Sequence, residues 1–128
     1  MADHGHYSLE QLAPRYCFKV PFIICNIWVT MLEIVQTKTF RKWLCDIREP
    51  SMTAAITARV ARLGAGHAGD VKHLSEGLWE MRIHQGPGLR IYFTRRSGKI
   101  VILLCGGDKG SQKRDIERAK SMLNNLEF

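Results

Sequence analysis

The sequence predicts an α+β fold with one mostly antiparallel β-sheet, in the element order β-α-α-β-β-β-β-α. Two apolar stripes at helical spacing lie between residues 37 and 63. Segments with strand-like patterns follow between residues 71 and 105, and a last amphipathic stretch closes the chain. We expect the two N-terminal helices to pack on one sheet face. The other face is then a partly open, basic concavity, with the closing helix at its edge.

The first thirty residues carry no regular pattern. Cys17–Val29 is apolar, but it is too short and too interrupted for a transmembrane helix. It also lacks the basic start and cleavage site of a signal peptide. We expect residues 1–30 to be a non-native start or dispensable tail, with Met31 beginning a single domain over residues 31–128. The alternative is that residues 22–29 add an edge strand.

A strand and a helix follow Met31. Leu32–Gln36 is a predicted strand, and Thr37 is a suitable N-cap for a helix from Lys38 to Arg48. The apolar stripe of this helix consists of Phe40, Trp43, Leu44 and Ile47.

The second predicted helix follows Pro50, which prevents the first helix from continuing. Ser51 is its expected N-cap, and the helix ends at Leu63. Its apolar stripe consists of Met52, Ile56, Val60 and Leu63. A glycine-rich loop then leads to a short strand, Val71–Leu74.

Residues 79–94 predict a β-hairpin with two unlike faces. The apolar face consists of Trp79, Met81, Ile83, Leu89, Ile91 and Phe93. The polar face consists of Glu80, Arg82, His84, Arg90, Tyr92 and Thr94. Both apolar sets must meet one core, so the loop needs an odd number of residues. Pairing Gln85 with Leu89 leaves the loop Gly86-Pro87-Gly88, and places Arg82 opposite Tyr92 and His84 opposite Arg90.

The last strand and helix complete the fold. Ile100–Cys105 is an unbroken apolar run, which predicts a strand covered on both faces. A turn at Gly106–Lys109 leads to a helix from about Ser111 to Leu126. We expect Trp43 and Trp79 to be core residues, because each lies on the apolar stripe of its element.

Charge and cysteine content limit the function classes. The chain has a net charge of +7, which favours polyanionic partners such as nucleic acid, although an acidic protein is attracted equally. The four cysteines form no Cys-x-x-Cys pair, and no zinc-finger spacing occurs. We expect Cys45 and Cys105 to be small core residues in a cytoplasmic protein.

Five segments in a fixed order resemble a known family. They read FRKWL, I-x-x-R-V-x-R-L-x-x-G, GD-x-K-x-L-x-E-G-x-W-E-M-R, G-P-G-x-R-I-Y and L-L-C-G-G-D-K-x-x-Q-x-x-D-I-x-x-A. Together they resemble the RelE/ParE superfamily of type II toxins, and more closely the addiction module killer protein branch near the phage-derived HigB-type toxins. The resemblance covers Leu32 to about Leu126 and implies a RelE-like fold.

The resemblance also implies an activity and partners. It implies an endoribonuclease, an mRNA interferase that inhibits translation by cutting mRNA, usually on the ribosome, with no metal and no cofactor. A cognate antitoxin is expected to cover the basic face, and operator DNA is bound only through that antitoxin. No membrane partner is expected.

Metal-free RNA cleavage needs a base for the 2′-hydroxyl, cations for the phosphorane and an acid for the leaving oxygen. Arginine suits the second task because its planar fork meets phosphate oxygens in pairs. Through the resemblance, Arg90 is the first candidate for this role and Arg82 the second. Lys109 matches a basic residue that other members carry after their last strand, and its alternative is a solvated loop lysine.

The acid–base residues are less well defined by the sequence. His84 and Tyr92 are the candidates on the polar face, and Asp108 is a candidate base or a partner that orients Lys109. The expected RNA-binding residues are Lys72, His73, Gln112 and Lys113.

The stretch SQKRDIERA departs from the resemblance, because it lacks the tyrosine or histidine that RNA-cleaving relatives often carry near the final helix. Two alternatives therefore stay open. One is a non-enzymatic, ParE-like gyrase poison, and the other is a degenerate toxin that only binds its antitoxin.

Overall fold

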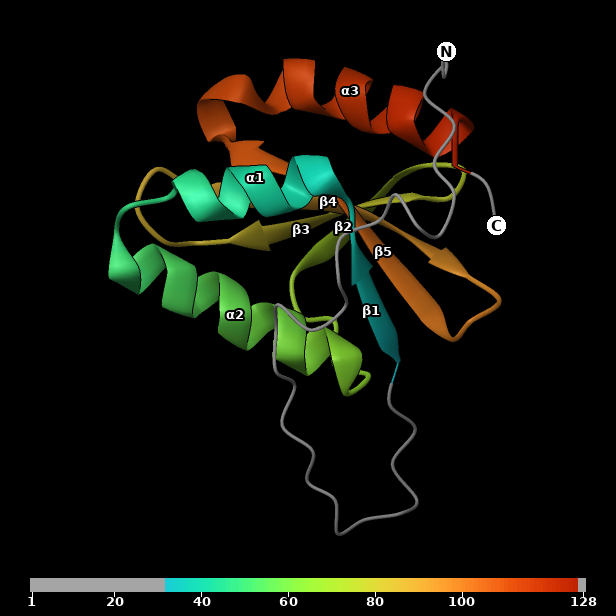
Figure 1. Ribbon diagram of the computed structural model, residues 1–128, viewed down its shortest axis with the longest axis horizontal. Helices are drawn as coiled ribbons and strands as arrows, with labels where there is room; N and C mark the ends of the chain where they lie inside the picture. The colour runs from blue at the N-terminus through green and yellow to red at the C-terminus, as the bar shows by residue number, and fades with distance from the viewer. Residues whose placement is uncertain (1–31, 127–128) are drawn as a thin grey trace, which may run out of the picture.

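A computed structural model describes residues 32–126, and their order of elements is the predicted one (Figure 1). The elements are β1 (Glu33–Gln36), α1 (Lys38–Asp46), α2 (Pro50–Gly64), β2 (Val71–Ser75), β3 (Leu78–Ile83), β4 (Leu89–Arg96), β5 (Ile100–Asp108), the 3-10 turn η2 (Lys109–Ser111) and α3 (Gln112–Asn124). The predictions made for residues 1–30, including the edge strand 22–29 and the start at Met31, lie outside the described residues.

The strands form one mixed sheet in the order β1-β5-β4-β3-β2. β1 pairs with β5 in parallel, and every other neighbouring pair is antiparallel. The prediction of a mostly antiparallel sheet in an α+β fold is confirmed.

A side-chain cap begins the first helix, and a proline begins the second. The Thr37 hydroxyl accepts a hydrogen bond from the Phe40 N–H (3.1 Å) and donates one to the Leu104 carbonyl (2.6 Å), which ties α1 to β5. The N-cap expected at Ser51 is wrong, because α2 already begins at Pro50 with Glu49 as its N-cap. Proline is well tolerated there, since the first turn of a helix needs no N–H partner.

Helices cover both faces of the sheet. α1 and α2 pack on one face over a core that contains Phe40, Ile56 and Leu103. α3 packs on the other face through Ala119 and Met122. Figure 1 shows α3 on the opposite side of the strands from α2. The predicted open concavity with α3 at its edge is therefore wrong, because the apolar side of α3 is buried across that face.

β5 is covered on both faces, as predicted, but it is longer than expected. Gly106 and Gly107 continue the pairing with β4, so the turn begins only after Asp108. A register shift in this pairing lets both Leu104 and Cys105 join the core beneath α3. Cys105 is a core residue as expected. The same prediction for Cys45 is wrong, because that side chain lies on the exposed side of α1.

Candidate functional site

The β3–β4 hairpin has the predicted faces but a different register. Ile83 pairs with Leu89, so the loop spans residues 84–88 rather than three residues. Consequently Arg82 lies opposite Arg90, and Glu80 lies opposite Tyr92. Gly86 and Gly88 have φ values of 58° and 85°, which only glycine adopts easily, and they allow the longer loop to fold back on itself.

The polar face of this hairpin is organised around a buried carboxylate. The Glu80 side chain is 0% exposed. It accepts a hydrogen bond from Arg82 Nε (3.0 Å) and another from Gln112 Nε2 (2.7 Å), and Arg90 Nε lies 3.9 Å away. We call Glu80, Arg82, Arg90, Tyr92 and Gln112 the Glu80 cluster.

Electrostatics explain why this carboxylate is present. Arg82 and Arg90 are directly opposite each other, and like charges in that position repel. Glu80 lies beside both guanidinium groups and compensates their charge, while they supply the partners that a buried carboxylate requires. Sequence reasoning placed Glu80 on the polar face but gave it no role. The alternation of Glu80 with Arg82 on one strand face was the available signal.

The members of the Glu80 cluster differ in exposure. The side chains of Arg82 and Arg90 are 32% and 10% exposed. Tyr92 is fully buried beneath α3, and this burial together with the nearby Glu80 carboxylate raises the pKa of its hydroxyl well above the usual value. The Tyr92 hydroxyl is therefore protonated at neutral pH and does not face solvent.

Lys109 lies beside the Glu80 cluster. A Cβ atom on Gly88 would lie 3.7 Å from Lys109 Cβ and 3.9 Å from Arg90 Nη1, so the hairpin loop lies next to both residues. Asp108 has a structural task, because its carboxylate accepts the Ser111 N–H (3.1 Å) and caps η2. Three predicted cationic residues, Arg82, Arg90 and Lys109, thus lie at the same end of the sheet.

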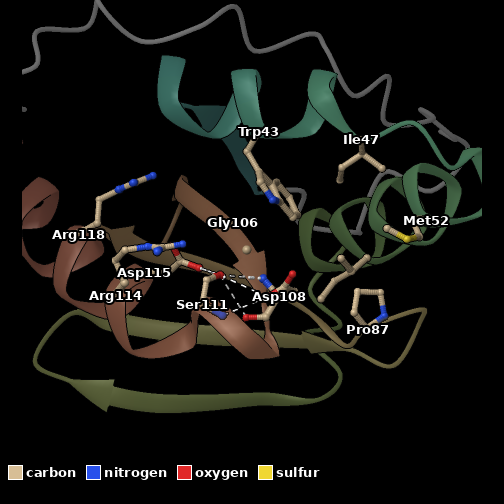
Figure 2. A pocket seen from close by; sticks show the side chains of 12 residues that line it. Trp43, Ile47, Met52, Pro87, Gly106, Asp108, Ser111, Arg114, Asp115 and Arg118 are labelled. Carbon is tan, nitrogen blue, oxygen red and sulfur yellow. Dashed lines mark hydrogen bonds between the residues drawn. The ribbon is translucent and has the colours of Figure 1, made fainter.

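A cleft of about 320 Å³ opens next to this end, between α1 and the start of α3 (Figure 2). We call it the Trp43 cleft. Its lining residues are Trp43, Ile47, Met52, Pro87, Leu89, Gly106, Gly107, Asp108, Ser111, Arg114, Asp115 and Arg118. Sequence reasoning missed it, because its walls come from elements far apart in the chain.

Two glycines make this cleft possible. A Cβ on Gly106 would overlap the Trp43 indole, and a Cβ on Gly107 would overlap the Asp115 carboxylate. The buried Asp115 accepts a short hydrogen bond from the Ser111 hydroxyl. Because glycine has no side chain, Trp43 and Asp115 pack directly against the backbone of β5 at Gly106 and Gly107. This packing positions the aromatic wall and the acidic wall of the cleft.

Two comparisons bear on identity. A family model described as Phage derived protein Gp49-like matches residues 47–124. The chain belongs to this Gp49-like family. It is a family of phage-derived toxins from toxin–antitoxin modules, within the RelE-like superfamily. The match spans α2 to α3, and so includes the Glu80 cluster and Lys109.

A Haemophilus influenzae (strain Rd) protein, described as an uncharacterized protein, is 42% identical over 95 residues. The aligned region covers 74% of this chain and 96% of that protein.

The Gp49-like chain does not gather every predicted site residue. His84 is 76% exposed, and its Nε2 lies 2.8 Å from Asp70 Oδ2 rather than facing Arg90. This hydrogen bond lowers the pKa of Asp70. Lys72 lies opposite Glu80 and shares its face, whereas His73 lies on the other face, with its ring 4.6 Å from that of Trp79.

The described part of this Gp49-like chain offers neither a metal site nor a membrane-spanning helix. Lys113 is exposed on the first turn of α3. Over residues 32–126, no three His, Cys, Asp or Glu side chains are grouped so that they could hold a metal ion. None of the helices in this region is long and apolar enough to cross a membrane. Trp43 and Trp79 both pack partly buried against the core, as expected.

Proposed function

We propose that this Gp49-like protein is a cytoplasmic toxin that inhibits translation by cutting mRNA on the ribosome, without a metal or cofactor. The observation that carries the proposal is the placement of Arg82, Arg90 and Lys109 at one end of the sheet, with the buried Glu80 hydrogen-bonded to Arg82 and 3.9 Å from Arg90 Nε. Membership of a toxin–antitoxin family implies an antitoxin partner. We further propose that operator DNA is bound only through that antitoxin.

The proposed chemistry is transfer of the phosphodiester to its own 2′-oxygen. Arg82 and Arg90 bind the non-bridging oxygens and stabilise the phosphorane charge, and Lys109 adds a third cation. The 2′-oxygen attacks phosphorus as its proton leaves, and the bond to the 5′-oxygen breaks with protonation of that oxygen. The products are a 2′,3′-cyclic phosphate and a 5′-hydroxyl.

Proton transfer is assigned to exposed groups at this end of the molecule. His84 is the first candidate, because its imidazole is accessible and is oriented by Asp70. The carboxylate of Asp108 is already used as a cap, and Tyr92 is buried. Lys72, Gln112 and Lys113 extend the proposed RNA track around the Glu80 cluster, and His73 lies on the opposite face.

The test is inducible expression of the full chain, followed by primer extension on a translated reporter mRNA. We expect new 5′ ends within the reading frame, which disappear with Arg90→Ala and persist with Arg95→Ala, at the far end of β4. Growth arrest without new ends would contradict cleavage.

A non-enzymatic gyrase poison is the second candidate. The observation that favours it is the burial of Tyr92, together with the absence of tyrosine and histidine from α3. Growth arrest accompanied by DNA breaks would support this function. A chain that causes no arrest but still binds its antitoxin would be the degenerate toxin.

A further inference from the structure

The Trp43 cleft borders the proposed phosphate site but has no task in it. We propose that this cleft binds one nucleobase of RNA, next to the phosphate that Arg90 and Lys109 hold. The identity of the polymer rests on the proposed function, and the cleft itself defines a base subsite.

Position supports this assignment. Pro87 lines the cleft, and the next residue, Gly88, lies next to Arg90 and Lys109. Leu89 and Asp108 also line the cleft and are paired across β4 and β5. The two cations are the residues that directly follow this pair. Arg90 lies on the polar face of β4 and Leu89 on the apolar face, so a nucleotide held at the loop end of Arg90 reaches the cleft by passing Gly88 at the end of the sheet.

The walls of the cleft suit a flat, uncharged ring. Figure 2 shows Trp43 reaching from α1 towards Ser111, Asp108 and Asp115, with Met52 and Pro87 at one end. An aromatic and apolar wall favours stacking with any base. The opposite oxygen-bearing wall accepts hydrogen bonds from ring or amino N–H groups. Because two carboxylates lie there, a phosphate is disfavoured inside the cleft.

Two arginines at the rim of the cleft supply positive charge for the RNA phosphates that flank the bound base. Arg114 and Arg118 are both exposed and lie one helical turn apart on α3. Within residues 32–126, neither forms an ion pair with a carboxylate. Like charges at this spacing weaken a helix slightly, so the pair is better explained by an anionic partner than by helix stability. The volume of about 320 Å³ accommodates a base with part of its sugar.

The test uses RNA that cannot be cleaved, so it does not depend on enzymatic activity. The full chain carries Trp28→Phe and Trp79→Phe, which leaves Trp43 as the fluorophore. The probes are a 2′-O-methyl tetranucleotide and its abasic counterpart. We expect saturable quenching of Trp43 by the tetranucleotide but not by the abasic chain. We also expect roughly tenfold weaker tetranucleotide binding for Trp43→Leu, followed by anisotropy, and near-normal binding for Trp43→Phe.

The controls separate this inference from the proposed function. Trp79→Leu in the natural background is the matched control and should leave binding unchanged, and circular dichroism checks that each variant folds. Arg114→Gln with Arg118→Gln should weaken binding while Trp43 stays quenched at saturation.

Three outcomes would overturn the base subsite. Binding without quenching, or no binding at all, would remove it, and the primer-extension experiment decides the proposed function separately. Quenching by an antitoxin peptide alone would make the cleft a protein-docking site.

Discussion

Glu80 is a buried acidic residue on a basic sheet face, and its carboxylate lies beside the guanidinium groups of two arginines. Its carboxylate contacts Arg82, Arg90 and Gln112, so it joins β3, β4 and α3 through one side chain. Arg82, held by its hydrogen bond to Glu80, has a lower ordering cost for gripping a phosphate, whereas Arg90 Nη1 also donates to the Leu89 carbonyl (3.5 Å).

The first prediction concerns removal of this charge. Glu80→Gln leaves Arg90, which is 10% exposed, opposite Arg82 without a compensating anion. Breaking a buried ion pair costs about 3–5 kcal/mol, and we expect a loss of stability approaching that range in urea unfolding. Glu76→Gln, in the exposed β2–β3 turn, is the matched control. Equal stability of the two variants would contradict the central role of Glu80.

At the scale of elements, β5 is the strand on which both helical layers depend. Gly106 contacts Trp43 of α1 and Gly107 contacts Asp115 of α3, so two successive residues meet opposite layers. The absence of a side chain at Gly106 and Gly107 therefore determines the position of both the cleft and the start of α3.

The second prediction tests that close approach. A methyl group at Gly107 would overlap the Asp115 carboxylate and push α3 away from the sheet. We expect Gly107→Ala to lose about 1–3 kcal/mol, the usual cost of overpacking, as measured by thermal unfolding. Gly110→Ala is the control, because its nearest neighbour would be 3.3 Å away at an exposed position. Comparable melting of both variants would show that α3 adjusts freely.

The third prediction concerns the layer between α3 and the sheet. Burial raises the pKa of the Cys105 thiol from 9.0 to about 12. The unfolded chain loses this proton at lower pH than the folded chain, so stability is intact below about pH 9 and falls as pH rises towards about 12. Urea unfolding against pH should show this fall, and Cys105→Ala should reduce it, leaving the part that comes from the raised pKa of Tyr92. Cys45→Ala, at an exposed site, should not change the slope.

At the scale of the whole molecule, the period-2 and period-3.6 patterns were sufficient for the element order and for the two faces of the hairpin. They could not fix the hairpin register, because an odd loop of three or five residues satisfies the same constraint. They also could not place α3. The apolar side of α3 shows that the helix packs on the sheet, but it does not show on which face. The sequence therefore predicts an exposed Tyr92, although α3 buries it.

Part of the candidate site was predictable for the same reason. Arg82, Arg90 and Lys109 follow from strand alternation and chain order, aided by the family resemblance. The role of Glu80 depends on register, and the Trp43 cleft depends on the packing of α1 against β5. Both are tertiary consequences that no local pattern contains.

The last prediction uses the charge of the whole chain. With a net charge of +7, binding to single-stranded RNA should weaken steeply with salt, because each phosphate contact releases a condensed counterion. Each contact contributes about 0.7 to the slope of log K against log salt for single strands. Lys109→Gln should therefore lower the slope for uncleavable RNA by about 0.7. Arg95→Gln removes the same charge at the other end of β4, where the guanidinium lies 5.7 Å from the Trp79 ring. An equal loss of slope in both variants would mean that RNA responds to overall charge rather than to the end of the sheet where Arg82, Arg90 and Lys109 meet.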